Sequence, residues 1–578
     1  MATTKVSALT AKTTPSGSEE LLINDGGVSK KITQTNLLST ALPLAGGTMT
    51  GNITLGTNTI DGLEINTTAT SNLGLGTGAV DSITTGDYNV GVGDYAGTAI
   101  TTGTNNVLVG GLTGDAITTG SNNTALGGGA LSENTTASNN TAVGFYALLS
   151  NTTGASNTAV GYQSLYSNTT ANLNTAVGMY ALKANTTSAA NTAVGYTALT
   201  ANTTGLENSA FGYAGLYSNT TGGYNTSTGY KALYSNTTGA NNTASGYQAL
   251  NANTTGTYNT GVGSLALQLT TTGISNTGVG GQALQNNTTG SNNVAVGVNA
   301  LDGNTTASNN TAVGQSAMKI NTTGANNTAT GLESLRYNTT GANNTAVGYK
   351  ALRSNTTGYD NVAIGGQTAM QDNTTGNRNT AIGPYCLTQC TTGTQNTSLG
   401  YAALYELTTG TNNTGVGKDS GRAASPSGNI TTSSGVFCLG DNTVTALYCA
   451  DTSISSSDGR DKTDVEDFTA GLDFITQMRP VTYRWDKRTD YLTDENQDTL
   501  SIVPDGTHKK PKQHIGFISQ EVQALEQALG FATDKDNELI CNTNEDATAM
   551  GLKYERLVPI LVNAIKELSA KVEALENA

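Results

Sequence analysis

Charged and large apolar side chains are scarce in this chain of 578 residues. Asp, Glu, Lys and Arg make up 12% of it and aromatic residues 6%, whereas Gly alone fills 71 positions. A chain of this length is too long for a single core, so several domains are expected. Its few large side chains leave little with which to build an ordinary globular core. The composition is typical of a disordered polar tract or a fibrous repeat, and periodicity decides between them.

Positive charge and long apolar runs are lacking as well. The chain has 27 Lys and Arg against 42 Asp and Glu, a formal charge of −15. A phosphate backbone would be repelled by such a surface, so we expect no nucleic-acid partner. No run reaches the about 18 apolar residues of a spanning helix, and MATTKVSALTAK has no apolar stretch of a secretory signal. We therefore expect no membrane insertion.

The chain has five cysteines, a small and odd number. A long chain without an export signal seldom relies on disulfides, so we expect no disulfide framework. Cys386 and Cys390 have a spacing that would suit a metal clip, but no second pair lies near them, and His508 and His514 are far downstream. The sequence therefore predicts no metal site and no cofactor.

A repeat of 17 residues, N-T-A-V-G-Y-x-A-L-x-x-N-T-T-G-x-x, fills the middle of the chain. Its leading Asn recurs in steps of 17 from Asn89 to Asn361, then after one step of 18 at Asn379, and in steps of 17 to Asn413. These are twenty units with a single slip, within GGQTAMQDNTTGNRN. A disordered tract has no reason to keep such a register, whereas a solenoid does, because each unit stacks on its neighbours.

Each repeat unit predicts one coil of a β-solenoid. T-A-V-G alternates small and β-branched residues, which favours a short strand, and we expect a second short strand at the A-L pair. N-T-T-G predicts a turn in which Asn and Gly take left-handed backbone angles. Stacking places Asn above Asn and Val above Val about every 4.8 Å, so ladders of Asn and Thr can satisfy one another's hydrogen bonds.

A coil this thin buries little surface by itself, which predicts that the chain assembles with further copies. Val143 and Leu148 would bury more surface against partner chains than alone, so we expect a trimer, with a monomeric β-helix as the alternative. The repeat resembles the parallel β-roll heads of trimeric adhesins and the stacked shafts of phage fibres. Aromatic residues after the strand, as at Phe145 and Tyr162, pack between coils or chains, or else form a row of rings that contacts sugars.

The N-terminal part of the chain lacks the period. The segments LLINDGGVSKKITQTNLL (21–38) and PLAGGTMTGNI (43–53) resemble modules found at the start of phage tail fibres. This resemblance implies that residues 1–88 attach to the virion through baseplate or tail proteins. The repeat shaft is then expected over 89–430, followed by a connector over 431–456.

The composition changes again at the C-terminal end, where residues 457–578 hold 37 of the 69 charged residues, both histidines and the only tryptophan. Here SDGRDK (457–462) matches the S-D-x-R-x-K signature of the auto-processing chaperone domain of endosialidase tailspikes and many phage fibres. The similarity continues through GLDFITQMRPVTYRW (471–485), HIGFISQEVQ (514–523) and LKYERLVPILVNAIKELSAKVEAL (552–575). The chain thus resembles bacteriophage tail fibres with a C-terminal intramolecular chaperone. The fold expected is mainly β and fibrous, a trimeric stacked β-roll or β-helix, with a C-terminal α+β domain that ends in a helical coiled coil.

The resemblance also implies a Ser/Lys dyad that cuts its own chain. Ser457 would attack the carbonyl carbon of Ser456, and Lys462 would take the hydroxyl proton. A hydroxyl needs such a neighbouring base, and an amine whose pKa burial has lowered can serve. Asp458 and Arg460 would fix the turn by hydrogen bonds. Without the resemblance, the same segment reads as a solvated polar loop.

Four more residues of the matched segments have expected roles. His514 and Glu521 are expected to support the motif. His514 could be a base, but a structural role is favoured because the dyad already has one. Tyr483 and Trp485 are expected in the core of the domain.

The last segment has apolar residues at alternating spacings of three and four, which is typical of a coiled coil. They are Val558, Leu561, Ile565, Leu568, Val572 and Leu575. Branched residues alternating with Leu nominally favour two strands, whereas the family resemblance implies three. The alternative is an amphipathic helix that packs on its own domain.

Together these patterns predict a homotrimeric tail fibre that binds a host receptor, either a glycan or an outer-surface protein. Repetitive strands specify register weakly, so a trimerising end would align the chains. Its self-cleavage before Ser457 would then leave the fibre kinetically trapped. We expect a protein of the virion tail, made in the host cytoplasm, whose peptidase acts only on its own chain.

The alternatives are a glycan-degrading tailspike and a non-phage trimeric adhesin with the same domain. A tailspike enzyme needs a pair of carboxylates in a cleft, but the repeats have few acids, at irregular positions such as Glu133, Glu207 and Asp302. A bacterial adhesin would need an export signal and an anchor, and neither is visible. A membrane-tethered transcription factor would need a basic DNA-binding region.

Overall fold

The computed structural model describes residues 71–444, 463, 465–492, 499–532, 534, 537–543 and 550–578, and the backbone of short strands before residue 65. The chain divides into two units, Met1–Leu63 and Glu64–Ala578. In the first unit, β1 (Glu20–Asp25) pairs antiparallel with β2 (Val28–Thr33), and β3 (Thr54–Leu55) pairs antiparallel with β4 (Asn58–Thr59). Strand β5 spans Leu63–Glu64.

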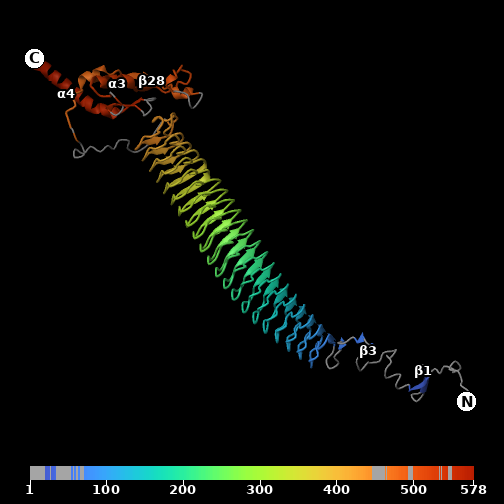
Figure 1. Cartoon of the computed structure of the whole chain (residues 1–578). Coiled ribbons are helices and arrows are strands. Elements are labelled where there is room, and N and C mark those ends of the chain that lie inside the picture. The colour runs from blue at the N-terminus through green and yellow to red at the C-terminus, as the bar shows by residue number, and fades with distance from the viewer. Residues whose placement is uncertain are drawn as a thin grey trace, which may run out of the picture. The chain divides into compact units, whose positions relative to one another are not determined.

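Residues 71–444 form a parallel β-solenoid to which each coil contributes one short strand (Figure 1). The strands are β6 (Leu73–Leu75), β7 (Val90–Val92), β8 (Val107–Val109), β9 (Thr124–Leu126), β10 (Thr141–Val143), β11 (Thr158–Val160), β12 (Thr175–Val177), β13 (Thr192–Val194), β14 (Ser209–Phe211), β15 (Thr226–Thr228), β16 (Thr243–Ser245), β17 (Thr260–Val262), β18 (Thr277–Val279), β19 (Val294–Val296), β20 (Thr311–Val313), β21 (Thr328–Thr330), β22 (Thr345–Tyr349), β23 (Val362–Gln367), β24 (Thr380–Ile382), β25 (Thr397–Leu399), β26 (Thr414–Val416) and β27 (Phe437–Leu439). Each pairs in parallel with the next along the chain, with equivalent repeat positions side by side. This confirms the predicted solenoid of 17-residue coils.

The strand run extends beyond the sequence repeat at both ends. Strand β6 lies one coil before the first regular unit, and its neighbour Asn72 already accepts a hydrogen bond from the backbone N–H of Asn89. At the other end β27 follows β26 after a longer connection, and Asn413 accepts a hydrogen bond from the N–H of Val436. The terminal coils therefore keep the hydrogen bonds of the ladder although their sequences drift from the repeat.

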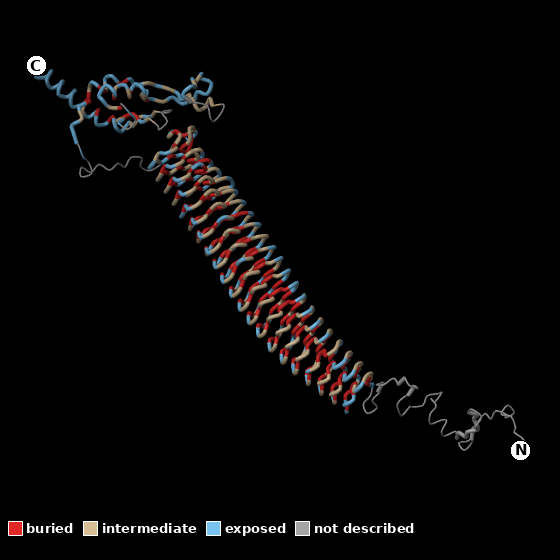
Figure 2. The backbone as a smooth tube through the Cα atoms, in the orientation of Figure 1, coloured by how far each residue is buried: buried red, intermediate tan, exposed pale blue. Residues whose placement is uncertain are grey.

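Each coil closes its core within a single chain. In the coil that begins at Asn140, the side chains of Asn140, Ala142, Leu148 and Asn151 are all 0% exposed. The strand alternates, with Ala142 inward and its neighbours Thr141 and Val143 outward and half-buried. Figure 2 shows the same alternation, because buried residues alternate with intermediate and exposed residues along each coil of the solenoid. The prediction that Leu148 would bury more surface against partner chains was therefore wrong, because the neighbouring coils already cover it completely.

Two columns of buried asparagines confirm the predicted ladders. In the first column, Asn157 donates from its backbone N–H to Oδ1 of Asn140 at 2.9 Å, and from Nδ2 to the carbonyl of Ala171 at 2.8 Å. In the second, Asn151 donates from Nδ2 to Oδ1 of Asn134 at 3.0 Å and to the carbonyl of Gly154 at 2.9 Å. These bonds satisfy amides that would otherwise be costly to bury.

The turns differ from the sequence prediction. The A-L pair lies in a turn and not in a second strand, and Leu148 itself has a left-handed backbone, with φ of 54°. In the N-T-T-G turn, Asn151 and Gly154 are absent from the residues with positive φ, whereas Asn139 and Tyr146 have φ of 63° and 57°. The left-handed angle turns Leu148 into the core, and burial of its side chain offsets the strain.

The single 18-residue step is accommodated by an irregular strand. β23 is six residues long, and its pairing with β22 shifts register between Val347 and Tyr349, so that Tyr349 faces Gln367. The ladder bond from the N–H of Asn379 to Oδ1 of Asn361 stays at 3.0 Å. The extra residue is therefore absorbed in a bulge on the surface, and the core stays in register.

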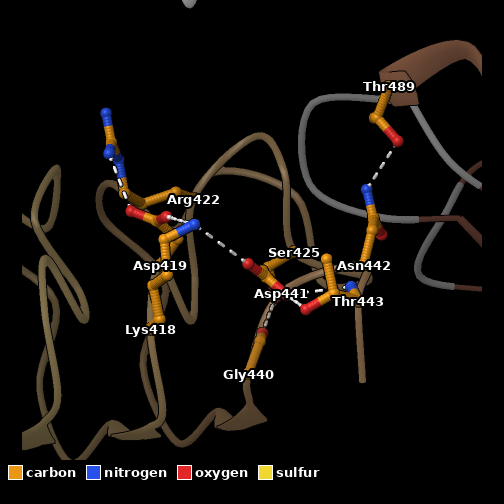
Figure 3. A network of polar contacts seen from close by, with 9 residues as sticks. All are labelled: Lys418, Asp419, Arg422, Ser425, Gly440, Asp441, Asn442, Thr443 and Thr489. Atoms are coloured by element: carbon orange, nitrogen blue, oxygen red, sulfur yellow. Dashed lines mark hydrogen bonds and ion pairs between the residues drawn. The ribbon is translucent and has the colours of Figure 1, made fainter. Parts of the chain in front are cut away.

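A polar network covers the last coil (Figure 3). Lys418 lies 3.2 Å from a carboxylate oxygen of Asp419 and 3.5 Å from one of Asp441, and Arg422 lies 2.9 Å from Asp419. Ser425 donates to the carbonyl of Gly440 at 3.0 Å. A terminal strand offers unpaired backbone groups to other chains, and charges at such an edge oppose that pairing.

The C-terminal domain contains helices α2 (Leu472–Gln477), α3 (Ser519–Ala528) and α4 (Leu557–Glu576). Two small antiparallel pairs accompany them, β28 (Val481–Tyr483) with β29 (His514–Gly516) and β30 (Cys541–Thr543) with β31 (Met550–Leu552). Short 3-10 turns lie at η3 (Arg488–Tyr491), η4 (Thr499–Ser501) and η6 (Tyr554–Arg556). Among the described residues, no helix has both the length and the apolarity for a membrane span.

Candidate functional site on the C-terminal domain

The expected dyad lies outside the described residues. Ser456, Ser457, Asp458, Arg460 and Lys462 all fall in this part of the chain. The described part of the domain begins a few residues later and is fastened to helix α4 (Leu557–Glu576).

Helix α4 holds the segment that leads into α2. Asn563 donates from Nδ2 to the carbonyls of Phe468 at 2.6 Å and Ala470 at 3.3 Å. Glu567 accepts a hydrogen bond from the N–H of Leu472 at 3.2 Å, and so satisfies a free donor at the start of α2. At Gly471, a Cβ atom would lie 2.1 Å from Oε1 of Glu567, so a larger residue would require the Glu567 side chain to shift. The chain shortly after the signature is therefore fixed on α4.

Two faces of α4 differ sharply in burial. Leu557, Ile560 and Ala564 are buried, and the first two pack in one cluster with Phe474 and Met478. The six residues of the predicted seam lie on another face and are exposed by 42% to 77%: Val558, Leu561, Ile565, Leu568, Val572 and Leu575. The helix is thus amphipathic on its own domain, as the alternative prediction had it, and it also presents a second apolar face to solvent. We name this second face the α4 seam.

His514 and the two aromatic residues form a cluster on the β28–β29 pair. The His514 ring stacks on Tyr483, with centroids 5.6 Å apart and an interplanar angle of 21°. Trp485 lies 6.4 Å from the His514 ring centroid but is 47% exposed, and Tyr483 is half-buried. The prediction that Trp485 belongs to the core was therefore wrong within one chain, because the two-stranded pair has one face uncovered.

Glu521 pairs with Arg479 across the surface between α3 and the end of α2. Arg479 donates to both carboxylate oxygens, and this hydrogen bond lowers the pKa of Glu521. Beside the pair lies a cavity of about 260 Å³ whose lining includes Met478, Phe517 and Leu525. Both charged groups are exposed, so the pair orients the two segments and adds little stability.

Glu526 is a buried residue that the sequence analysis missed. Its side chain is 1% exposed and accepts hydrogen bonds from the backbone N–H groups of Ile540 and Cys541. It thereby joins α3 to β30. Burial and the nearby Glu526 carboxylate raise the pKa of the Cys541 thiol, which is therefore not a nucleophile. No sequence signal marked Glu526, because its helix position resembles that of any solvated glutamate.

The cysteines of the solenoid are also inert. Cys386, Cys390 and Cys438 are buried and free, and burial raises the pKa of the Cys390 thiol to about 11. Cys390 takes the place of an asparagine in the second ladder. Across the described part of the chain, no group of three His, Cys, Asp or Glu side chains is arranged to hold a metal ion.

Comparison with known proteins gives a match to the C-terminal part of the chain. Residues 457–531 match the family described as the chaperone of endosialidase. Neither the curated proteins nor the solved structures give a match. The match confirms the resemblance predicted from the signature and from the segments 471–485 and 514–523, whereas the segment 552–575 lies beyond the matched residues. The chain therefore carries a C-terminal chaperone of endosialidase domain behind a long β-solenoid, a combination that fits a tail fibre or tailspike.

Proposed function

We propose that the protein is a homotrimeric bacteriophage tail fibre whose C-terminal domain aligns three chains and then cleaves itself off before Ser457. The observation that carries this proposal is the α4 seam, six apolar residues at coiled-coil spacing that their own domain leaves exposed. In a monomeric domain such a face would stay exposed to water and would add no stability. Three seams packed together would bury it and would bring three chain ends to one level.

Register is the physical problem that this arrangement solves. All coils pair through the same positions, so a slip of one coil between neighbouring chains would cost little locally. Three chains joined at α4 start from a common end, and the effective concentration of the remaining coils rises. Removal of the domain afterwards would leave the fibre without the nucleus from which it could reverse.

The virion-proximal role of residues 1–88 and binding of a host glycan or outer-surface protein complete the proposal. We expect the mature protein in the virion tail after synthesis in the host cytoplasm. A glycan-degrading tailspike would need a pair of carboxylates in a cleft, and among the acids of the described coils Glu333 is held by Arg336 and Arg353. An ion-paired carboxylate with a lowered pKa makes a poor general acid.

The test of cleavage compares the full chain with single variants. We expect fragments 1–456 and 457–578 from the parent and from Ser455→Ala, and one uncut chain from Ser457→Ala and Lys462→Ala. Intact mass and N-terminal sequencing of the small fragment are the measurements. A fragment that starts at another residue, or cleavage that persists in Ser457→Ala, would overturn the assignment of the nucleophile.

A further inference from the structure

One face of the solenoid carries no charge along its whole length. We name it the strand face and define it as the first and third residue of each strand from β6 to β27, which point outward. Every one of these positions is Thr, Ser, Val, Leu, Ile or Phe. The third residue is apolar in most coils and is exposed by 36% to 47% in ten of them: Leu126, Phe211, Val262, Val279, Val296, Val313, Ile364, Ile382, Leu399 and Leu439.

Charges do occur on the solenoid, but at other repeat positions. Glu133 and Glu406 occupy the tenth position after the ladder asparagine, Lys183 and Arg353 the ninth, and Glu207 the position before it. The coil therefore tolerates charge at several outward positions. The strand face shares its lack of charge with the two threonines of the N-T-T-G turn, such as Thr152 and the exposed Thr153, but the strand face is also apolar at most of its third positions. A sheet face that only met water would gain solubility from Lys or Glu.

We propose that the strand face is the surface through which the solenoid packs against two further copies of itself, parallel and in register. This inference rests on the proposed homotrimer and adds the contact surface. In a parallel, in-register trimer each residue meets its own two copies at the same height. Any charge on the contact face would therefore face like charges in a desolvated interface, which is destabilising. A face that is uncharged at every level meets this condition.

The available area is sufficient for a stable interface. Stable protein interfaces bury about 800 Å² on each partner. Over the run of strands from β6 to β27, a contribution on the order of 40 Å² per coil would reach that value. β-Branched side chains lose little rotamer freedom on packing, so this burial is inexpensive in entropy.

A sugar chain is the other occupant to consider, because aromatic residues flank the strand face. Tyr196, Tyr213, Tyr230 and Tyr247 form a column with centroids 5.1 to 5.4 Å apart and interplanar angles of 8° to 18°. Their ring faces therefore cover one another and only their edges point outward. Such a stack stabilises neighbouring coils and offers no open ring face on which a sugar could lie.

The test places a charge on or off the strand face within one coil. Val262→Glu lies on the strand face, and Leu269→Glu lies at the position where other coils carry Glu133 and Glu406; the parent residues are 38% and 41% exposed. The full chain is used, with trimer content measured by sedimentation and thermal resistance of the trimer by gel. We expect Val262→Glu to lower the trimer's melting temperature and Leu269→Glu to leave it unchanged.

Cross-linking of single-cysteine variants gives a second, independent test of the contact surface. Val296→Cys on the strand face is expected to cross-link between chains on mild oxidation, and Ile320→Cys, which is 40% exposed elsewhere, is not. A trimer that tolerates Val262→Glu and fails to cross-link at residue 296 would overturn the strand face as the contact and leave the homotrimer standing. A chain that sediments as a monomer would overturn the homotrimer itself. An intact trimer in which only Val262→Glu abolishes binding to host cells would assign the face to the receptor.

Discussion

The solenoid and the C-terminal domain treat their apolar residues in opposite ways. Each coil buries its inward-facing Ala, Leu and Asn completely within one chain, as Ala142 and Leu148 show, although outward residues such as Leu126 stay exposed. The C-terminal domain buries Leu557 and Ile560 but leaves the α4 seam exposed, together with about half of Trp485. The core of each coil is therefore completed by the next coil, whereas the domain leaves an apolar helix face uncovered within one chain. The proposed trimer would cover that face, so under this proposal assembly starts at the C-terminal domain.

The largest effect on assembly is expected from a charge placed in the α4 seam. Ile565→Glu should abolish the trimer, because each chain would bury an unpaired carboxylate at a cost of about 3 kcal/mol or more, over a hundredfold in the assembly constant. The β-sheet signal in circular dichroism should persist, because the coils close their own core. Sedimentation of the full chain measures the effect.

Ala570→Glu is the matched control for this experiment. It lies on the same helix, about half a turn away from the seam at 100° per residue, and is exposed. Its trimer should be unchanged. If both variants stay trimeric, the α4 seam does not hold the chains together, and the solenoid itself must do so.

The second prediction tests the solenoid's dependence on its neighbouring coil. Gly246 has φ of 139°, and a Cβ there would lie 2.4 Å from the carbonyl oxygen of Gly263 in the next coil. Gly246→Ala should therefore cost about 3 kcal/mol, from a strained backbone and a backbone clash. Hydrogen exchange is expected to rise in the adjacent coils, since coupling in a solenoid is between neighbours.

The control glycine in the preceding turn lies at Gly239. A Cβ there would also come within 2.4 Å of a carbonyl oxygen, that of Gly256, yet Ala137, Ala171 and Ala307 occupy the equivalent position in other coils. Those coils keep the ladder bonds, as the contact between Asn157 and Ala171 shows. Gly239→Ala should therefore cost less than about 1 kcal/mol. Equal losses from both variants would mean that space alone, and not the backbone angle, sets the need for glycine.

Periodicity predicted the solenoid because equivalent positions had to stack, and the Asn ladders followed from the same argument. The left-handed Leu148 could not be predicted, because local preference disfavours it and only burial by the next coil reverses the balance. The same holds for Glu526, whose partners, the N–H groups of Ile540 and Cys541, lie far along the chain. The signature predicted the family of the domain, but the exposure of Trp485 depends on a face that no sequence pattern marks.

The smallest expected effect concerns the charged network on the last coil of the solenoid. Burial alone would raise the pKa of Asp441, but the hydroxyl and N–H of Thr443 and the charge of Lys418 hold it below the ordinary value of 3.8. A carboxylate with a lowered folded pKa contributes stability that is present above the unfolded value and is lost as the pH falls through the folded one. The last coil should therefore begin to fray below about pH 4, while the inner coil of β17, held by neutral amides, should not. Hydrogen exchange of β27 and β17, corrected for intrinsic rates, measures the difference.

The variant Asp441→Asn is the control. At neutral pH its β27 amides should be less protected from exchange than those of the parent, and on acidification they should lose less of that protection. Equal acid sensitivity of β17 and β27 would show that the pH dependence does not arise in this network.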